Sequence, residues 1–338
     1  MTTYREAPGA GPQTVDLELE LETYRRELTG YCYRMLGSGF EAEDAVQEAM
    51  VRAWRAIDTF EGRASLRSWL YRIATNVCLD MIQGRQRRAL PMDLVSSSSG
   101  DSEAGPRLPE SKWIQPIPAG RAVQPTEDPA EVTESRETIR VAFIAALQHL
   151  PARQRAVLIL REVLRWKASE VAELLDTSVV SVNSALQRAR STLAESNVAD
   201  TDVLTPQDDE QRALLARYVD AFERFDIDAL VSLLHEDATM SMPPYELWLE
   251  GADELRKWLL GAGSGCRGSR FEPVEANGSP AFAQWRAGGP GGSFEAWAIH
   301  VLRVSDGRIS GIDFFVDPDL FPLFGLPVRL GDQAGAHR

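Results

Sequence analysis

The chain has 338 residues, which is enough for two or three domains with separate cores. Its formal net charge of −14 argues against a uniformly basic nucleic-acid binder, but the charge is unevenly divided. Residues 21–90 hold 11 Lys/Arg against 9 Asp/Glu, residues 137–194 hold 8 against 5, and residues 201–338 hold 12 against 22. Two mildly basic blocks therefore precede an acidic one, which could oppose phosphate binding through repulsion or by covering a basic face.

The cysteines and the hydropathy pattern indicate the cellular compartment of the protein. Cys32, Cys78 and Cys266 have no metal-ligand spacing, and they suit a reducing environment without structural disulfides. No apolar run is long enough to span a membrane, and the N-terminal residues lack a signal-peptide core. We therefore expect a cytoplasmic protein that has no membrane partner, no metal ion and no cofactor.

Residues 1–16 are predicted to be disordered, and three helices are predicted within residues 17–90. The second helix starts in an acidic turn at residues 41–44, and its predicted apolar stripe consists of Val46, Met50, Ala53, Trp54 and Ile57. The third helix starts near Ser65, and its predicted apolar positions are Leu66, Trp69, Leu70, Ile73, Val77 and Met81. It ends in a cluster of arginines, which are Arg85, Arg87 and Arg88.

Residues 91–136 are rich in serine and proline and hold 8 acidic against 4 basic residues. This composition predicts a linker that is extended and poorly ordered by itself. Residues 112–118 within it are too apolar for a pure spacer, so we expect them to dock on another part of the protein.

Residues 137–195 predict further helices, and the last two have a sharp break between them at residues 176–178. Ser178 is a good N-cap for the final helix, whose predicted buried side is Val179, Val182, Leu186 and Ala189. The opposite side is short, polar and cationic, and it consists of Ser181, Asn183, Ser184, Gln187, Arg188 and Arg190. Such a helix suits the major groove of DNA. The alternative is a helix pair that only packs inside an all-α domain.

A short linker is predicted at residues 196–208, followed by an α+β domain at 209–326 and a tail at 327–338. Helices are predicted at 209–225, 227–235 and 253–260. Strands are predicted at 238–242, 271–276, 281–287, 293–304 and 308–315. This order predicts a curved antiparallel sheet with helices packed against it.

Two separate blocks carry a resemblance to a known family. The first is DAVQEAMVRAWR at 44–55 with FEGRASLRSWLYRIATNVCLDMI at 60–82, and the second is LPARQRAVLILREV at 150–163 with the helix-turn-helix after it. Residues 17–194 resemble sigma-70 family RNA polymerase sigma factors of the extracytoplasmic-function type. The linker sequence WIQP and the ending GRISGIDFFVDPDLF resemble the subgroup with a C-terminal SnoaL-like domain. The implied fold is multidomain, with region 2 at 17–90, region 4 at 137–195 and a SnoaL-like cone at 209–326.

The resemblance also implies partners and site residues. The partners are core RNA polymerase, through its β′ clamp helices and β flap, and promoter DNA at the minus-ten and minus-thirty-five elements. The residues implied in polymerase binding are Asp44, Gln47 and Glu48. Those implied in DNA binding are Arg72, Asn76, Arg85, Arg87, Arg88, Ser181, Asn183, Ser184, Gln187 and Arg188. We favour a core position for Trp69. Asp176 stands where the family usually has glycine, and it tolerates the left-handed turn that this position requires.

The C-terminal block leaves its role open. A candidate ligand pocket comprises His235, Trp248, Trp285, His300 and Asp313, with Tyr245 and Trp297 as further candidates. His300 and Asp313 could in principle move a proton, but such groups in a sheet are usually structural. Our hypothesis is that this acidic domain regulates the two basic regions and has a cavity for a small ligand.

The sequence therefore predicts a non-enzymatic initiation factor made of two separate helical bodies, a flexible connector and a regulatory domain. One alternative is a helix-turn-helix regulator that acts without polymerase. The other is a DNA-binding module fused to a SnoaL-like enzyme. A separate anti-sigma partner stays open.

Overall fold

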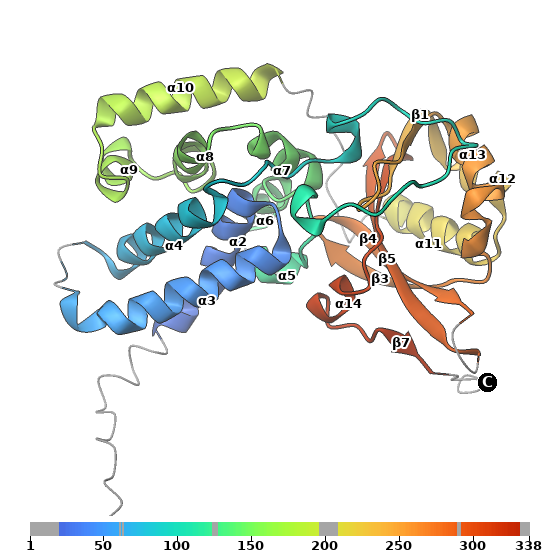
Figure 1. The fold of residues 1–338 in the computed structure, drawn as a ribbon, viewed down its shortest axis with the longest axis horizontal. Coiled ribbons are helices and arrows are strands. Elements are labelled where there is room, and N and C mark those ends of the chain that lie inside the picture. Colours follow the sequence, from blue (N-terminus) through green and yellow to red (C-terminus); the bar gives the residue numbers. More distant parts are fainter. Residues whose placement is uncertain are drawn as a thin grey trace, which may run out of the picture.

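The computed structural model describes residues 20–60, 62, 64–123, 128–195, 209–288 and 292–331. A helical half from the first part of the chain lies beside an α+β half from the last part (Figure 1). The predicted disordered N-terminus, the linker at 196–208 and most of the tail lie outside the described residues. None of the helices in the described ranges is long and apolar enough to cross a lipid bilayer.

The first helical body contains α2 (Arg25–Leu36), α3 (Gly39–Ala56) and α4 (Leu66–Ile82), with a 3₁₀ turn η1 (Ile57–Thr59) after α3. A serine caps the start of two of these helices. The Ser38 hydroxyl accepts a hydrogen bond from the Glu41 amide, and the Ser65 hydroxyl accepts one from the Ser68 amide. These bonds satisfy amides that have no partner within the helix, and they confirm the predicted start near Ser65.

The sequence pattern wrongly predicts that Trp54 is buried. The buried stripe of α3 includes Val46, Met50 and Ala53, but the Trp54 side chain is 58% exposed. Because consecutive helical residues are turned by about 100°, Trp54 points away from the stripe that Ala53 joins. An exposed tryptophan therefore lies on the same helix as the predicted polymerase-binding residues.

The second helical body is a series of short helices: α7 (Val141–Gln148), α8 (Ala152–Leu158), the π-helical turn η4 (Ile159–Val163), α9 (Ala168–Leu174) and α10 (Val179–Glu195). Helices α9 and α10 form the predicted helix-turn-helix. Asp176 in the turn has φ +49°, and the Ser178 hydroxyl accepts a hydrogen bond of 3.1 Å from the Ser181 amide. Both local predictions for this turn are confirmed.

The predicted buried side of α10 is correct except at its first residue. Val182, Leu186 and Ala189 are buried, whereas the Val179 side chain is 41% exposed. Val179 follows directly on the turn at residues 176–178, which is itself exposed and covers nothing. The apolar stripe therefore starts one turn later than expected.

The two helical bodies pack on each other. Helix α4 contacts α8 and α9, and α2 contacts α7 and α8. The ring of Tyr71 lies 4.9 Å from that of Trp166, and the Arg67 guanidinium group lies over both rings at 5.6 and 5.4 Å. The two predicted helical regions are both present, and their apolar surfaces are buried against each other in one core.

The described residues of the predicted linker, 91–123 and 128–136, lie between these bodies and the α+β half. They contain η2 (Pro91–Asp93), η3 (Glu110–Lys112), α5 (Ala119–Ala122) and α6 (Pro129–Glu137). Within the linker, Trp113, Ile114 and Ile117 are almost fully buried. The expectation that residues 112–118 dock on another part of the protein is confirmed.

Backbone hydrogen bonds attach the same linker to the α+β half. The Ser98 amide donates to the Trp248 carbonyl at 2.8 Å, and the Leu108 amide donates to the Pro244 carbonyl at 3.0 Å. The Trp248 indole donates in turn to the Val95 carbonyl at 2.8 Å. The linker is therefore not the poorly ordered spacer that its composition predicts, because its polar backbone finds partners on the neighbouring domain.

The α+β half starts with α11 (Asp209–Glu223) and α12 (Ile227–Ser232), and α13 (Ala252–Leu260) with the 3₁₀ turn η5 (Ala262–Cys266) follows the first two strands. The strands are β1 (Leu234–Ser241), β2 (Trp248–Glu250), β3 (Arg270–Ala276), β4 (Ser279–Ala287), β5 (Phe294–Ser305), β6 (Arg308–Phe315) and β7 (Arg329–Leu330). The short helix α14 (Leu320–Leu323) lies between β6 and β7.

The strands form one sheet in the order β2-β1-β6-β5-β4-β3, and β7 pairs with β5. Strands β1 and β6 are parallel, whereas the other neighbours are antiparallel. The sheet is therefore mixed and mostly antiparallel, and the predicted antiparallel sheet is confirmed except for this one parallel pair. The parallel pair follows from the long connection between β1 and β6, which carries four other strands.

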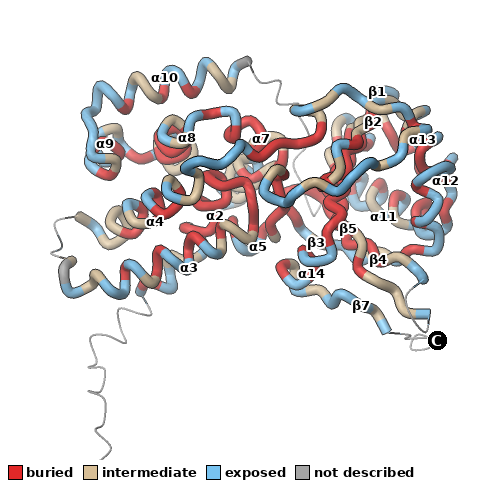
Figure 2. Tube along the Cα trace, in the orientation of Figure 1, coloured by how far each residue is buried: buried red, intermediate tan, exposed pale blue. Residues whose placement is uncertain are grey.

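The two faces of this sheet pack against different parts of the chain (Figure 2). Ala298 and Leu302 of β5 belong to a core with α11, α12 and α13. Ile299 and Val301 of the same strand belong to the core of the helical half. Alternate residues of one strand thus stabilise two different bodies, and the α+β domain is fixed to the helical half through its sheet.

Candidate functional site

The predicted polymerase-binding residues lie on the outer side of α3. Asp44, Gln47 and Glu48 are all exposed. Asp44 and Gln47 line a hollow of about 640 Å³ between α2, α3 and α5, and Arg121 of α5 also lines it. Arg121 forms an ion pair with Glu43, so the linker helix α5 borders this surface.

The predicted minus-ten surface of α4 faces the second helical body. Arg72 and Asn76 are exposed, and the Arg72 guanidinium group donates a 2.7 Å hydrogen bond to the Glu173 carbonyl of α9. Trp69 is half-buried, and its ring lies 5.0 Å from that of Phe60. One predicted DNA contact is therefore already bonded to the helix-turn-helix.

The arginine cluster after α4 is also engaged. Arg85 and Arg88 form ion pairs with Glu41 at 2.5 and 2.9 Å, and Arg87 shares a hydrogen bond with His149 of the second body. Arg88 is only 7% exposed and donates to the carbonyls of two linker residues, Glu110 and Trp113. Arg88 therefore holds the linker against the first helical body in this structure, and its contact with DNA stays a prediction.

Helix α10 lies on the outside of the helical half (Figure 1). Of its predicted DNA contacts, Ser181, Asn183, Gln187 and Arg188 are exposed and Ser184 is half-buried. Val180, which the sequence interpretation does not single out, is 74% exposed at the start of this helix. The predicted reading face of α10 is thus open.

One side chain of the α+β domain connects the first helical body, the linker and the residue pair that leads into α7 of the second body. Asn277, in the turn between β3 and β4, is fully buried. Its side-chain amide donates to the Tyr33 hydroxyl at 2.5 Å and to the Ile139 carbonyl at 2.7 Å. Its side-chain oxygen accepts from the Ile117 amide at 3.1 Å, and its own amide donates to the Ile117 carbonyl. We call this group of bonds the Asn277 latch.

The sequence contains a local signal for this turn but none for its partners. Asn277 and Gly278 have φ of +55° and +64°, as an Asn-Gly hairpin turn requires. A Cβ atom on Gly278 would lie 2.7 Å from the Arg136 carbonyl oxygen. Only glycine therefore fits where the hairpin turn meets the end of α6.

The five candidate pocket residues do not form one pocket. His300 pairs with Phe314 across β5 and β6, whereas Asp313 pairs with Val301. His300 and Asp313 therefore point to opposite faces of the sheet and cannot exchange a proton directly. Trp285 belongs to the core shared with the helical half, Trp248 bonds the linker, and His235 bonds the Ser305 carbonyl.

His300 has the contacts of a structural residue. It is fully buried, its Nδ1 lies 2.9 Å from the Tyr218 hydroxyl, and its Nε2 lies 2.8 Å from the side-chain oxygen of Gln284. The rings of Phe222, Phe271 and Phe314 surround it. Burial lowers the pKa of His300 to about 3, so its ring stays neutral.

Asp313 also has structural partners. It is fully buried, accepts a 2.6 Å hydrogen bond from the Ser241 hydroxyl, and lies 3.6 Å from the Arg303 guanidinium group. A Cβ atom on Gly311 would collide with that guanidinium group, so this glycine makes room for Arg303 across β6. The group fixes β1, β5 and β6 together.

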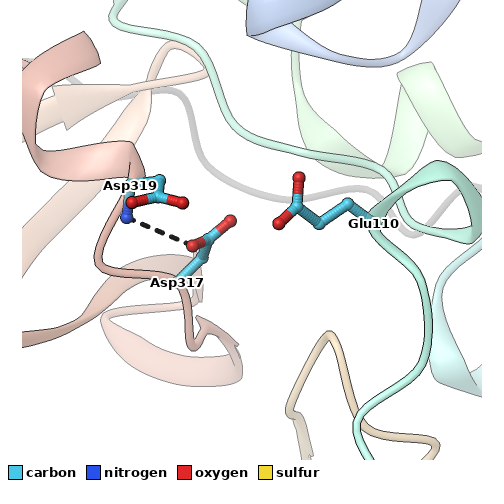
Figure 3. A group of neighbouring side chains, drawn as sticks. All are labelled: Glu110, Asp317 and Asp319. Atoms are coloured by element: carbon cyan, nitrogen blue, oxygen red, sulfur yellow. Dashed lines mark hydrogen bonds between the residues drawn. The ribbon is translucent and has the colours of Figure 1, made fainter.

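Three carboxylates meet where the linker crosses the α+β domain (Figure 3). They belong to Glu110 of the linker and to Asp317 and Asp319 beside α14. Arg107 lies 3.4 Å from Asp317 and 3.8 Å from Glu110. Burial raises the pKa of Glu110 and of Asp317, with repulsion between the carboxylates adding to it. Because Arg107 already balances part of this charge, we assign the group to linker docking.

Together these features define a class of protein, namely a helix-turn-helix DNA-binding factor with a second helical body and a fused α+β domain. Three family models match the chain: sigma-70 region 2 at residues 21–88, sigma-70 region 4 at 140–193 and a SnoaL-like domain at 215–312. The ECF RNA polymerase sigma factor SigG of Mycobacterium tuberculosis (strain ATCC 25618 / H37Rv) is 45% identical over 323 residues, which cover 93% of this chain and 85% of that protein. The chain belongs to the ECF RNA polymerase sigma factors.

Two further similarities concern SigJ, another ECF sigma factor of the same strain. Its sequence is 27% identical over 332 residues, which cover 94% of this chain and 97% of SigJ. The crystal structure of Mycobacterium tuberculosis SigJ aligns with a TM-score of 0.60 at 23% sequence identity, over 92% of this chain and 99% of that one. The helical regions joined to an NTF2/SnoaL-like domain are therefore a shared fold.

Family membership decides between the alternatives. A sigma factor is a transcription initiation factor that binds core RNA polymerase and promoter DNA, and it is not an enzyme. A regulator that acts without polymerase is excluded.

Proposed function

We propose that the α+β domain regulates this sigma factor by holding its two helical regions closed on each other. Asp44, Gln47 and Glu48 would contact the β′ clamp helices, and region 4 would contact the β flap. Helix α4 would bind the minus-ten element, and α10 would bind the minus-thirty-five element. The observation that carries the regulatory part is the Asn277 latch, since one buried side chain bonds region 2, the linker and region 4.

The contacts of the arginines support this proposal. Arg72 bonds the Glu173 carbonyl, and Arg87 bonds His149, so two predicted DNA contacts of region 2 are engaged with region 4. Helix α9 lies against α4, on the side from which a separated promoter strand would approach Arg72. Binding of the minus-ten strand therefore requires the two regions to move apart.

The polymerase surface and the reading helix are not restricted in the same way. Asp44, Gln47 and Glu48 are exposed on α3, and the polar face of α10 is open. The closed protein could therefore meet polymerase before the two regions separate. Core binding would favour opening if polymerase contacts the separated regions better than the closed pair.

The latch is strong enough to shift such an equilibrium. Asn277 makes three side-chain hydrogen bonds, and its partners are buried at the junction. Leaving a buried polar group without its partner costs about 1–3 kcal/mol. Because about 1.4 kcal/mol changes an equilibrium constant tenfold, losing the latch would raise the ratio of open to closed protein about 5- to 150-fold.

In vitro transcription with purified core polymerase tests the proposal. Full-length Asn277→Ala is compared with wild type and with Asp306→Ala, which changes an exposed positive-φ hairpin turn between β5 and β6. We expect higher promoter output for Asn277→Ala and wild-type output for the control. Removal of residues 205–338 should have the same effect, but it uncovers apolar surface, so the full-length variant decides. Unchanged output and unchanged core binding would refute regulation by this domain.

A further inference from the structure

A positively charged cleft lies between region 2 and region 4. It has a volume of about 190 Å³ and is bordered by the end of α4, the start of α3, η3 and the α7–α8 connection. Four arginines line it, which are Arg85, Arg87, Arg88 and Arg155. Among the described residues that line this cleft, Glu41 carries the one carboxylate, and it is shared by Arg85 and Arg88. The lining is strongly cationic although the whole chain is acidic.

Arg155 is the region 4 contribution to this cleft. It is 4% exposed, and its terminal nitrogens donate to the carbonyls of Met35, Gln148 and Leu150 and to the Gln148 side chain. These bonds hold the ends of α2 and α7 together, but none of them is to an anion. Its Nε has no hydrogen-bond partner although the atom is buried. Burial lowers the pKa of Arg155 to about 10, as expected for a cation without a carboxylate.

We propose that this cleft binds a phosphate group. Guanidinium groups present planar sets of N–H donors that match phosphate oxygens, and a group of four around one carboxylate leaves positive charge unbalanced. The volume accommodates a phosphate with room for a small substituent. Arg85 and Arg87 supply exposed donors from region 2, and Arg155 adds a positive charge from region 4 at the wall of the cleft.

This site has a consequence for the closed state. A bound phosphate group interacts with region 2 and region 4 at once, so it stabilises their packing by an amount that grows with the logarithm of one plus the ratio of the phosphate concentration to Kd. A free phosphorylated small molecule would therefore favour the closed form. A phosphate of the DNA backbone would use the same arginines, so the experiment has to separate the two sources.

Thermal unfolding of the full chain with inorganic phosphate tests the site, with chloride at matched ionic strength as the reference. We expect phosphate to raise the melting temperature of wild type and of Arg217→Ala, whose exposed arginine lies on α11, away from the cleft. The double variant Arg85→Ala/Arg87→Ala should lose this increase, because the change removes two of the four cations. Glu41→Gln should increase phosphate affinity several-fold, because it removes the competing carboxylate. Arg155 is left unchanged because it supports the fold.

Equal stabilisation of wild type and the double variant, or none in either, overturns the proposal. The salt dependence of promoter binding by the holoenzyme then distinguishes the two sources of the phosphate group, which are the DNA backbone and a free anion. If the DNA backbone is the source, the double variant lowers the slope of log K against log salt by about 2. If the source is a free anion, the slope stays at its wild-type value while phosphate binding is lost. Both results are distinct from failure of the latch, which is tested without phosphate.

Discussion

The Asn277 side chain of the SnoaL-like domain donates a 2.5 Å hydrogen bond to the Tyr33 hydroxyl of region 2. Tyr33 passes the connection on, since its own hydroxyl donates to the Gln115 carbonyl of the linker at 2.9 Å. Burial raises the pKa of Tyr33, so the hydroxyl keeps its proton at any physiological pH. A residue of the last domain is thus bonded, through one tyrosine, to both the first domain and the connector.

Gly278→Ala should open the protein more selectively than any deletion. Both Gly278 and Gly307 have positive φ, of 64° and 71°, so alanine causes backbone strain of about 1–2 kcal/mol at either position. Only the alanine at position 278 also meets the backbone of Arg136. We expect Gly278→Ala to raise promoter output above Gly307→Ala at similar domain stability. Equal output from the two variants would mean that this turn does not control opening.

Arg72→Ala tests whether this arginine bonds region 4 in the closed state and the minus-ten strand in the open state. The variant loses the bond to the Glu173 carbonyl and, in the open state, its proposed contact with the minus-ten strand. We expect weaker open-complex formation by the holoenzyme while core binding stays at the wild-type level. Filter binding with promoter DNA measures this, and Arg217→Ala is the control. A loss of core binding instead would place Arg72 on the polymerase surface.

Arg188 and Arg190 form a matched pair on α10. Arg188 is exposed on the predicted reading face, whereas Arg190 forms a 2.7 Å ion pair with Glu162 of η4. If Arg188 contacts a base edge, Arg188→Ala should cost about 1–3 kcal/mol of promoter binding and relax preference at one position of the minus-thirty-five element. Arg190→Ala should have a smaller effect that does not depend on sequence. Similar losses from both would indicate backbone contacts only.

The stability of the SnoaL-like domain should fall on mild acidification because of His300. Its pKa is about 3 in the folded state, whereas an exposed histidine in the unfolded chain has a pKa near 6.5. The unfolded state therefore binds a proton between these values and the folded state does not, so stability is complete above about pH 6.5 and is lost as the pH falls toward 3. The loss approaches about 1.4 kcal/mol per pH unit. Urea unfolding at pH 7 and 5 should show a smaller pH effect for His300→Gln than for wild type, and equal effects would contradict this origin.

Local features of this protein can be predicted from its sequence, because they depend on neighbouring residues. The N-cap of Ser178, the left-handed turn at Asp176 and the positions of β3 to β6 follow from hydrogen-bonding capacity, backbone preference and alternation. The family match adds the role of each region.

The closed arrangement could not be predicted in this way. Asn277 with Gly278 indicates only a hairpin turn, and nothing near it in the sequence points to Tyr33 or Ile139. The linker composition predicts disorder because its partners, such as the Trp248 and Pro244 carbonyls, lie far along the chain. Likewise the sequence predicts Arg88 as a phosphate contact, and nothing in the sequence indicates that this side chain is buried and donates to linker carbonyls.

The distance between region 2 and region 4 tests the central claim most directly. The three native cysteines are buried, so spin labels can be placed at Gln83→Cys after α4 and at Ser191→Cys on α10, both of which are exposed. For the free wild-type chain we predict one narrow distance distribution from pulsed electron spin resonance. Asn277→Ala and the promoter-bound holoenzyme should both show a longer and broader distribution. The same narrow distribution in all three samples would contradict the account, because the regions would then act without separating.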